Sequence, residues 1–189
     1  MGEIRDLVIS ALVLALAFSI TFARGIKWSV LSLFPASLAT VSAGFVFHEL
    51  AHRYAARSFG CFAEYRMWPL GLLLALLFAP LGIVFAAPGA VMIWPRVDIW
   101  ARPVWLGRRE YGMVSLVGSL ANMALALAFF LLRIPFPSTI ASLGARVNAG
   151  LAFFNLLPLP PLDGSKVFRW KKMAWAGAMS VAVAMLLLI

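Results

Sequence analysis

The chain has 189 residues, of which 63% are hydrophobic and only 12% are charged, and its mean hydropathy is +0.97. A water-soluble domain of this size could not bury so much apolar surface, so the composition predicts an integral membrane protein. The net charge of +9 is compatible with nucleic-acid binding, but the basic residues flank apolar runs, where positive charge orients membrane helices and meets anionic lipid. We therefore expect a lipid bilayer, and no nucleic acid, as the partner of this surface.

Long apolar stretches predict an all-α polytopic membrane protein with about five transmembrane helices, since each is close to the ~17–25 residues that a helix needs to cross the hydrocarbon. The expected helices cover 7–23, 31–57, 113–132, 140–157 and 173–189. The first is expected to stay uncleaved, because the segment before it, Glu3 to Asp6, is not clearly basic. Gly60 is expected to end the second helix.

The apolar stretch 70–94 is expected to differ from these helices. Pro80 and Pro88, each followed by a glycine within two residues, make one straight helix improbable. We expect a re-entrant, partly β hairpin segment here. No linker, repeat or soluble accessory domain is visible, so residues 1–189 are expected to form a single membrane-embedded domain, with its catalytic core at about 31–164.

The two histidines of the chain occur together, in the sequence His48-Glu49-Leu50-Ala51-His52. Residues four apart on a helix share one face, so both imidazoles can reach one metal ion while Glu49 stands beside them. A buried polar network is the alternative for such a pair. Ionisable groups inside an apolar helix are costly, however, and usually mark a functional site.

A catalytic zinc ion normally has three protein ligands and one open position, so a third ligand is needed. The other acidic residues lie in basic or interfacial segments; only Asp163 follows an apolar helix, in a turn broken by three prolines. Irregular backbone at membrane depth persists only where it is buried in protein or lines a wet cavity. We therefore expect His48, His52 and Asp163 to bind one Zn²⁺; the alternative for Asp163 is a helix N-cap before Gly164.

The segment Asn155-Leu156-Leu157-Pro158-Leu159-Pro160-Pro161-Leu162-Asp163-Gly164, together with the histidine segment, resembles the two signatures HExxH and NxxPxxPxDG of the site-2 protease family of intramembrane zinc metalloproteases. The resemblance covers about two-thirds of the chain. Gly118-Ser119-Leu120-Ala121-Asn122 is similar to the GPxxN helix of that family, with serine in place of proline.

The resemblance implies an endopeptidase that hydrolyses transmembrane protein substrates within or near the bilayer. Glu49 would act as the general base on a water molecule that zinc acidifies. Asn155 would hydrogen-bond the substrate backbone or the oxyanion, although a bond between helices explains it almost equally well. A zinc-binding transporter and a non-catalytic scaffold are the alternative functions.

The strand-like tail 87–93 could offer its edge to an extended substrate, with Val91 and Met92 among the contacts.

The topology also predicts on which side of the membrane the active site lies. His52 and Asp163 both lie near the exit ends of their helices, so an even number of crossings must separate them, and 70–94 must return to the side that it left. Twelve basic residues then gather on the face of the active site, which predicts that this face is cytoplasmic; they are Arg5, Arg53, Arg57, Arg66, Arg96, Arg102, Arg108, Arg109, Lys166, Arg169, Lys171 and Lys172, against Arg24, Lys27, Arg133 and Arg146 on the other face.

Overall fold

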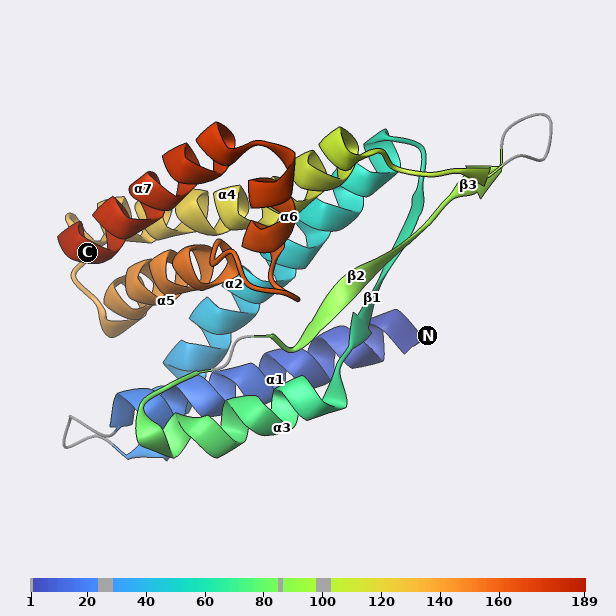
Figure 1. Ribbon diagram of the computed structural model, residues 1–189. Coiled ribbons are helices and arrows are strands. Elements are labelled where there is room, and N and C mark those ends of the chain that lie inside the picture. Colours follow the sequence, from blue (N-terminus) through green and yellow to red (C-terminus); the bar gives the residue numbers. More distant parts are fainter. Residues whose placement is uncertain (1, 24–28, 85–86, 98–102) are drawn as a thin grey trace.

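Five helices form at the positions that the apolar stretches predict (Figure 1). They are α1 (Gly2–Ala23), α2 (Val30–Ser58), α4 (Arg108–Arg133), α5 (Thr139–Asn155) and α7 (Lys172–Leu188). Helices α1, α2 and α4 are long and apolar enough to cross a membrane, whereas α5 and α7 have 17 residues each. The computed structural model describes residues 2–23, 29–84, 87–97 and 103–189. Arg24, Lys27 and Arg102, which entered the expected charge asymmetry, lie outside them.

Helix α2 begins and ends at recognisable capping residues. The Ser29 hydroxyl accepts a hydrogen bond of 3.2 Å from the backbone N–H of Ser32, which satisfies one of the unpaired donors at the helix start. Past the last turn, Gly60 has a φ of 81°, a left-handed conformation that suits glycine and stops the helix as expected.

The segment 70–94 does return to the side that it left. Helix α3 (Pro69–Phe78) and a short 3₁₀ turn, η1 (Ala79–Leu81), lead away, and β2 (Gly89–Trp94) leads back. Strand β2 pairs antiparallel with β1 (Phe62–Met67), so that Met67 lies opposite Gly89 and Phe62 opposite Trp94. The predicted hairpin range 70–94 is therefore incomplete, because the first strand of the hairpin, β1, precedes residue 70. Two shorter strands, β3 (Arg96–Val97) and β4 (Pro103–Val104), follow.

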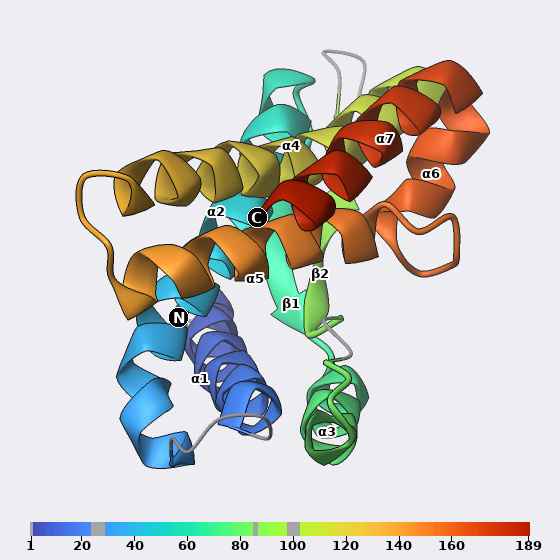
Figure 2. The same ribbon diagram turned by 90° about the vertical axis from the view of Figure 1, so that its left-hand side faces the viewer.

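Helix α2 is the central element of the fold. In Figure 1, α1 and α3 lie below it and α4, α5 and α7 above it, and Figure 2 likewise has α1 and α3 in its lower half and α4 and α7 in its upper half. The main buried cluster joins α1, α2, β1 and α5 through Leu14, Val41, Phe45, Tyr65 and Leu151. The remaining α-helix, α6 (Asp163–Trp170), packs on α4 and α7. As a result, the second half of α2 is enclosed by elements from both ends of the sequence.

Candidate metal centre

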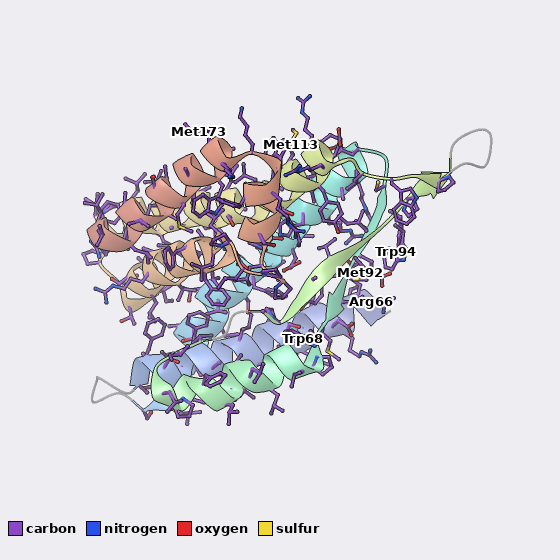
Figure 3. All side chains as sticks on the ribbon, in the orientation of Figure 1. Arg66, Trp68, Met92, Trp94, Met113 and Met173 are labelled. Atoms are coloured by element: carbon purple, nitrogen blue, oxygen red, sulfur yellow. The ribbon has the colours of Figure 1, made fainter. Side chains whose placement is uncertain are left out.

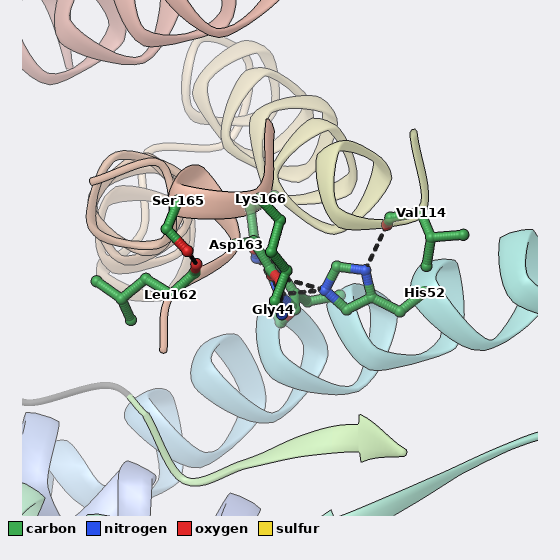
Figure 4. Close-up of polar contacts among 9 residues, drawn as sticks. Gly44, His52, Val114, Leu162, Asp163, Ser165 and Lys166 are labelled. Carbon is green, nitrogen blue, oxygen red and sulfur yellow. Dashed lines mark hydrogen bonds and ion pairs between the residues drawn. The ribbon is translucent and has the colours of Figure 1, made fainter. Parts of the chain in front are cut away.

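The three predicted ligands meet at one point between α2 and α6. Nε2 of His52 lies 2.9 Å from Nε2 of His48 and 2.9 Å from Oδ2 of Asp163, and Nε2 of His48 lies 3.4 Å from the same carboxylate oxygen. Both imidazoles are buried, and the Asp163 side chain is only 12% exposed. Figure 4 shows Asp163 reaching from α6 towards His52 on α2. The prediction that these residues come together is confirmed.

The other ring nitrogen of each histidine is already engaged. Nδ1 of His48 lies 2.7 Å from Oδ1 of Asn122, and Nδ1 of His52 lies 2.7 Å from the carbonyl oxygen of Val114. Because a side-chain or backbone carbonyl oxygen can only accept, each Nδ1 carries the proton. With Nδ1 engaged in this way, Nε2 is the ring nitrogen of each histidine that faces the common centre and can bind a metal ion there. This arrangement is typical of metal-binding histidines.

Asp163 is the first residue of α6 and does not cap it. The N-cap position belongs to Leu162, whose carbonyl accepts a hydrogen bond of 2.8 Å from the Ser165 hydroxyl. The N-cap alternative for Asp163 is therefore wrong, since its carboxylate faces the histidines. A side chain on Gly164 would collide with the backbone carbonyl of Leu156 at the end of α5. This close approach holds the first turn of α6 against α5 and fixes where Asp163 points.

Lys166 supplies a positive charge beside the third ligand. Its Nζ donates to Oδ1 of Asp163 at 2.9 Å, leaving Oδ2 for the histidine side. Burial alone would raise the pKa of Asp163, but His52, His48 and Lys166 hold it well below its usual value. For Lys166 the effects have the opposite sign: burial alone would lower its pKa, but the contact with Asp163 raises the pKa above its usual value. Both groups are therefore charged at neutral pH.

The absence of a side chain at residue 118 makes room for both imidazoles. A Cβ atom there would lie 2.5 Å from Cε1 and Nε2 of His52 and 2.7 Å from Cε1 of His48. Gly118 on α4 thus packs directly against both imidazoles. The similarity to a GPxxN helix did indicate this segment, but it did not indicate that the glycine touches the histidines.

The donor set fits zinc. Two donors that each lie ~2.0–2.1 Å from a tetrahedral zinc ion are about 3.3–3.4 Å apart, and the observed separations of 2.9–3.4 Å need only small adjustments. Two neutral imidazoles and one carboxylate are also a common ligand set of catalytic zinc, with a fourth position left open. These residues would hold one zinc ion.

Glu49 lies beside the ligands in a cavity of about 380 Å³. Its Oε2 atom is buried and has no hydrogen-bond partner among the described residues, which is costly unless a ligand or water molecule completes it. The same cavity is lined by Asn155, Val91 and Met92, which sequence reasoning assigned to the substrate. Asn155 and Val91 are half-buried, whereas Met92, labelled on β2 in Figure 3, is 47% exposed. Their contact with substrate stays a prediction.

Sequence reasoning missed the second row of residues around the centre. Asn148 on α5 is fully buried and accepts a hydrogen bond of 3.0 Å from Nδ2 of Asn122, while its own Nδ2 donates to the carbonyl oxygen of Gly144 at 2.9 Å. The sequence places Lys166 only among the basic residues of the expected cytoplasmic face. A lone asparagine in an apolar helix is the signal that could have indicated Asn148, because such polar groups require partners in lipid.

The fold and the centre together define a class. Apolar helices long enough to span a membrane enclose two histidines and an aspartate fit for one zinc ion, with a glutamate beside them: these are the features of a zinc metallopeptidase with a membrane-type fold.

Comparison with known proteins agrees with this class. "Putative zinc metalloprotease MJ0611" of Methanocaldococcus jannaschii is 42% identical over 180 residues, which cover 92% of this chain and 87% of the relative. "Putative zinc metalloprotease YwhC" of Bacillus subtilis is 32% identical over 160 residues, covering 74% of this chain and 70% of the relative. The chain belongs to the zinc metalloprotease family of these two relatives. No family model and no solved structure matches the sequence.

Proposed function

We propose that this protein is an intramembrane zinc metalloprotease of the site-2 protease type, which hydrolyses peptide bonds of transmembrane protein substrates within or near the bilayer. The observation that carries the proposal is the position of the centre. His48, Glu49 and His52 lie on α2, one of the helices that can cross a membrane, and they face a cavity enclosed by other apolar elements. A substrate would therefore meet the centre from within the helices and not on a soluble surface.

The residues around the cavity suggest how the reaction is divided. Zinc, when bound, would lower the pKa of a coordinated water molecule towards ~7 and polarise the scissile carbonyl. Glu49 would take the proton of the attacking water at Oε2 and pass it to the nitrogen of the leaving amine. Asn155, at the end of α5 and on the cavity wall, would hydrogen-bond the substrate backbone or the oxyanion.

We also propose that the substrate binds as an added strand along β2. Strand β2 lines the cavity from Gly89 to Ile93 and is the second strand of a two-stranded sheet. A transmembrane helix must unwind before its peptide bonds can be reached, and an exposed strand edge offers main-chain partners to the unwound segment. Val91 and Met92 would then contact the substrate.

The proposed orientation places the centre towards the cytoplasmic side of a cell membrane, with five crossings in total. The basic residues on the described part of the expected cytoplasmic face support it, because positive charge is retained on that side. Lys166 and Arg169 lie on α6, Lys171 and Lys172 follow it directly, and Arg53 and Arg57 follow the histidines on α2.

Replacing Glu49 by glutamine tests the proposal. Glutamine keeps the size of the side chain but cannot accept a proton, so cleavage of a single-span model substrate in proteoliposomes should fall by about 10²–10⁴-fold. Metal analysis should still find one zinc ion per chain. Glu110→Gln is the matched control, because this carboxylate lies at the start of α4 and does not line the cavity. Proteolysis at the wild-type rate by Glu49→Gln would contradict the proposal, and zinc-dependent transport without cleavage would favour a transporter.

A further inference from the structure

Two carboxylates at the start of α1 hold the outer edge of the β hairpin. Oε1 of Glu3 accepts a hydrogen bond of 3.1 Å from the backbone N–H of Tyr65, and Oδ2 of Asp6 accepts one of 3.4 Å from the N–H of Met67. Tyr65 and Met67 are two residues apart on β1, so both N–H groups point away from β2. The edge of β1 that strand pairing leaves open is thus covered by side chains.

The spacing of these contacts suits a helix that lies along a strand. Residues three apart on a helix are ~4.5 Å apart along its axis, and residues two apart on a strand are ~6.7 Å apart, a mismatch that the two carboxylate side chains can span. Ser10, on the same face of α1, makes a hydrogen bond of 2.9 Å with the Tyr65 hydroxyl. Asp6, Ser10 and Tyr65 are all at most 4% exposed, so the contact is part of the core.

The opposite edge of the hairpin is different. Because the N–H groups of Tyr65 and Met67 point outwards, Glu64 and Arg66 are the residues that exchange hydrogen bonds with β2, opposite Met92 and Ala90. The backbone groups of Gly89, Val91 and Ile93 therefore point away from β1, at the edge beside the cavity. Helix α1 closes one edge of the sheet. At the other edge, next to the metal centre, no strand of the described residues pairs with β2, and this edge is called the open edge.

Glu3 also connects this hairpin to the helix of the metal ligands. Its second carboxylate oxygen, Oε2, lies 3.2 Å from NH1 of Arg53, the residue that follows His52 on α2. The two side chains are only 17% and 29% exposed. A single carboxylate thus joins β1 to α2 one residue beyond a metal ligand, and it sets how far the open edge of β2 stands from the centre.

We infer that Glu3 and Asp6 are positioning residues that clamp the hairpin so that a substrate strand can add only at β2, at a fixed distance from the metal. The inference rests on the proposed function for the identity of the added strand, but the clamp itself is a property of the fold. It assigns a role to two residues that neither the motifs nor the metal centre involves.

Amide hydrogen exchange on the full-length protein in nanodiscs tests the clamp without any substrate. In Glu3→Ala the Tyr65 amide, and in Asp6→Ala the Met67 amide, should exchange at least about tenfold faster, the effect expected when a hydrogen bond to a charged group is lost. Glu3→Gln and Asp6→Asn keep an acceptor oxygen and should retain part of the protection. Glu110→Ala removes a carboxylate at the start of α4, away from α1, and should leave both amides unchanged.

Kinetics on the same variants tests the positioning role. Glu3→Ala should raise KM for a single-span substrate by roughly tenfold while kcat and the zinc content stay close to wild type, because the strand edge moves but the centre does not. A general loss of structure would instead lower the melting temperature and the zinc content together.

The outcomes separate this inference from the proposed function. Wild-type exchange at Tyr65 and Met67 in both alanine variants would overturn the clamp, whatever the protein cleaves. Faster exchange with an unchanged KM would overturn the positioning role. Faster exchange in a protein whose wild type cleaves no substrate would support the clamp and contradict the proteolytic function.

Discussion

Gly118 is the residue on which the shape of the metal centre depends most directly. In Gly118→Ala the new methyl group would lie 2.5–2.7 Å from the imidazoles of His52 and His48, so at least one ring must move. We expect the zinc dissociation constant to rise at least tenfold, as measured by competition with a chromogenic chelator.

A second glycine provides the control for this prediction. Gly150 on α5 has nothing within 4 Å of where its Cβ would be, so Gly150→Ala should leave zinc affinity unchanged. It should also add a little stability, by up to ~1 kcal/mol, because alanine favours a helix. Equal zinc affinity in Gly118→Ala and Gly150→Ala would show that the imidazoles are not held where the structure places them.

Asn122 should matter for zinc through His48. In Asn122→Leu the side chain keeps a similar size but no longer accepts from Nδ1 of His48, so the ring loses its fixed tautomer and orientation. We expect zinc affinity to fall by about 10–100-fold. Ser119→Ala on the same helix is the control, since the buried Ser119 hydroxyl has no partner among the described residues. An equal effect of the two substitutions would contradict the role of Asn122.

At this scale the ligands could be predicted and their supports could not. Two histidines four residues apart indicate a metal site by their spacing alone, and Asp163 is the one acidic residue in a proline-broken turn after an apolar helix. Val114 supports His52 through its backbone carbonyl, and the type of its side chain gives no indication of this role. Asn148 acts through its contact with Asn122 on α4, which a local pattern does not contain. Lys166 lies three residues after Asp163, and their pairing is recognisable only once both residues are known to lie on the helix α6.

Substrate binding to β2 can be tested by comparing a residue whose N–H points to the open edge with one whose N–H points to β1. By the alternation described above, the N–H of Val91 points to the open edge and that of Met92 to β1. Val91→Pro should therefore remove one donor to an added strand and raise KM, with little effect on the hairpin. Val91→Ala keeps the N–H and is the control for the lost side chain.

Met92→Pro is expected to do more damage than Val91→Pro. It removes a hydrogen bond of the ladder opposite Glu64, so both the hairpin and cleavage should be lost. Circular dichroism and KM on the same preparations distinguish the two effects. Cleavage by Val91→Pro with an unchanged KM would count against strand addition.

The helices were more predictable than the hairpin, for a physical reason. Apolar stretches long enough to cross a bilayer predict α1, α2 and α4 without any knowledge of their neighbours. The period of two in β1, with Ala63 and Tyr65 buried and Phe62 and Arg66 exposed, is clear only once the strand is known. Its partner lies beyond α3, and pairing over such a distance is set by the fold as a whole.

For the whole molecule, zinc should act as a cross-link. The ion would join α2 to α6, two elements from different halves of the chain, so removing it should lower stability. At free zinc of 100–1,000 times the dissociation constant, linkage predicts a loss of about 2.7–4.1 kcal/mol on chelation. Thermal unfolding in detergent with and without a chelator measures this effect, and added zinc should reverse it.

Two variants make this test specific. Glu49→Gln leaves all three ligands and should show the full dependence on zinc, whereas Asp163→Asn removes the carboxylate charge of one ligand and should show much less. If the melting temperature of every variant stays the same with and without zinc, the ion does not bind at this centre.

The wide separation of the ligands along the chain has a consequence for biosynthesis. A ribosome that has finished α2 has delivered both histidines and Glu49 to the membrane, but the carboxylate that completes the set emerges only after α4 and α5 have been made. Until then the nascent polypeptide holds an incomplete ligand set. Because Asp163 lies behind most of the sequence, the complete metal centre can form only late in the synthesis of the protein.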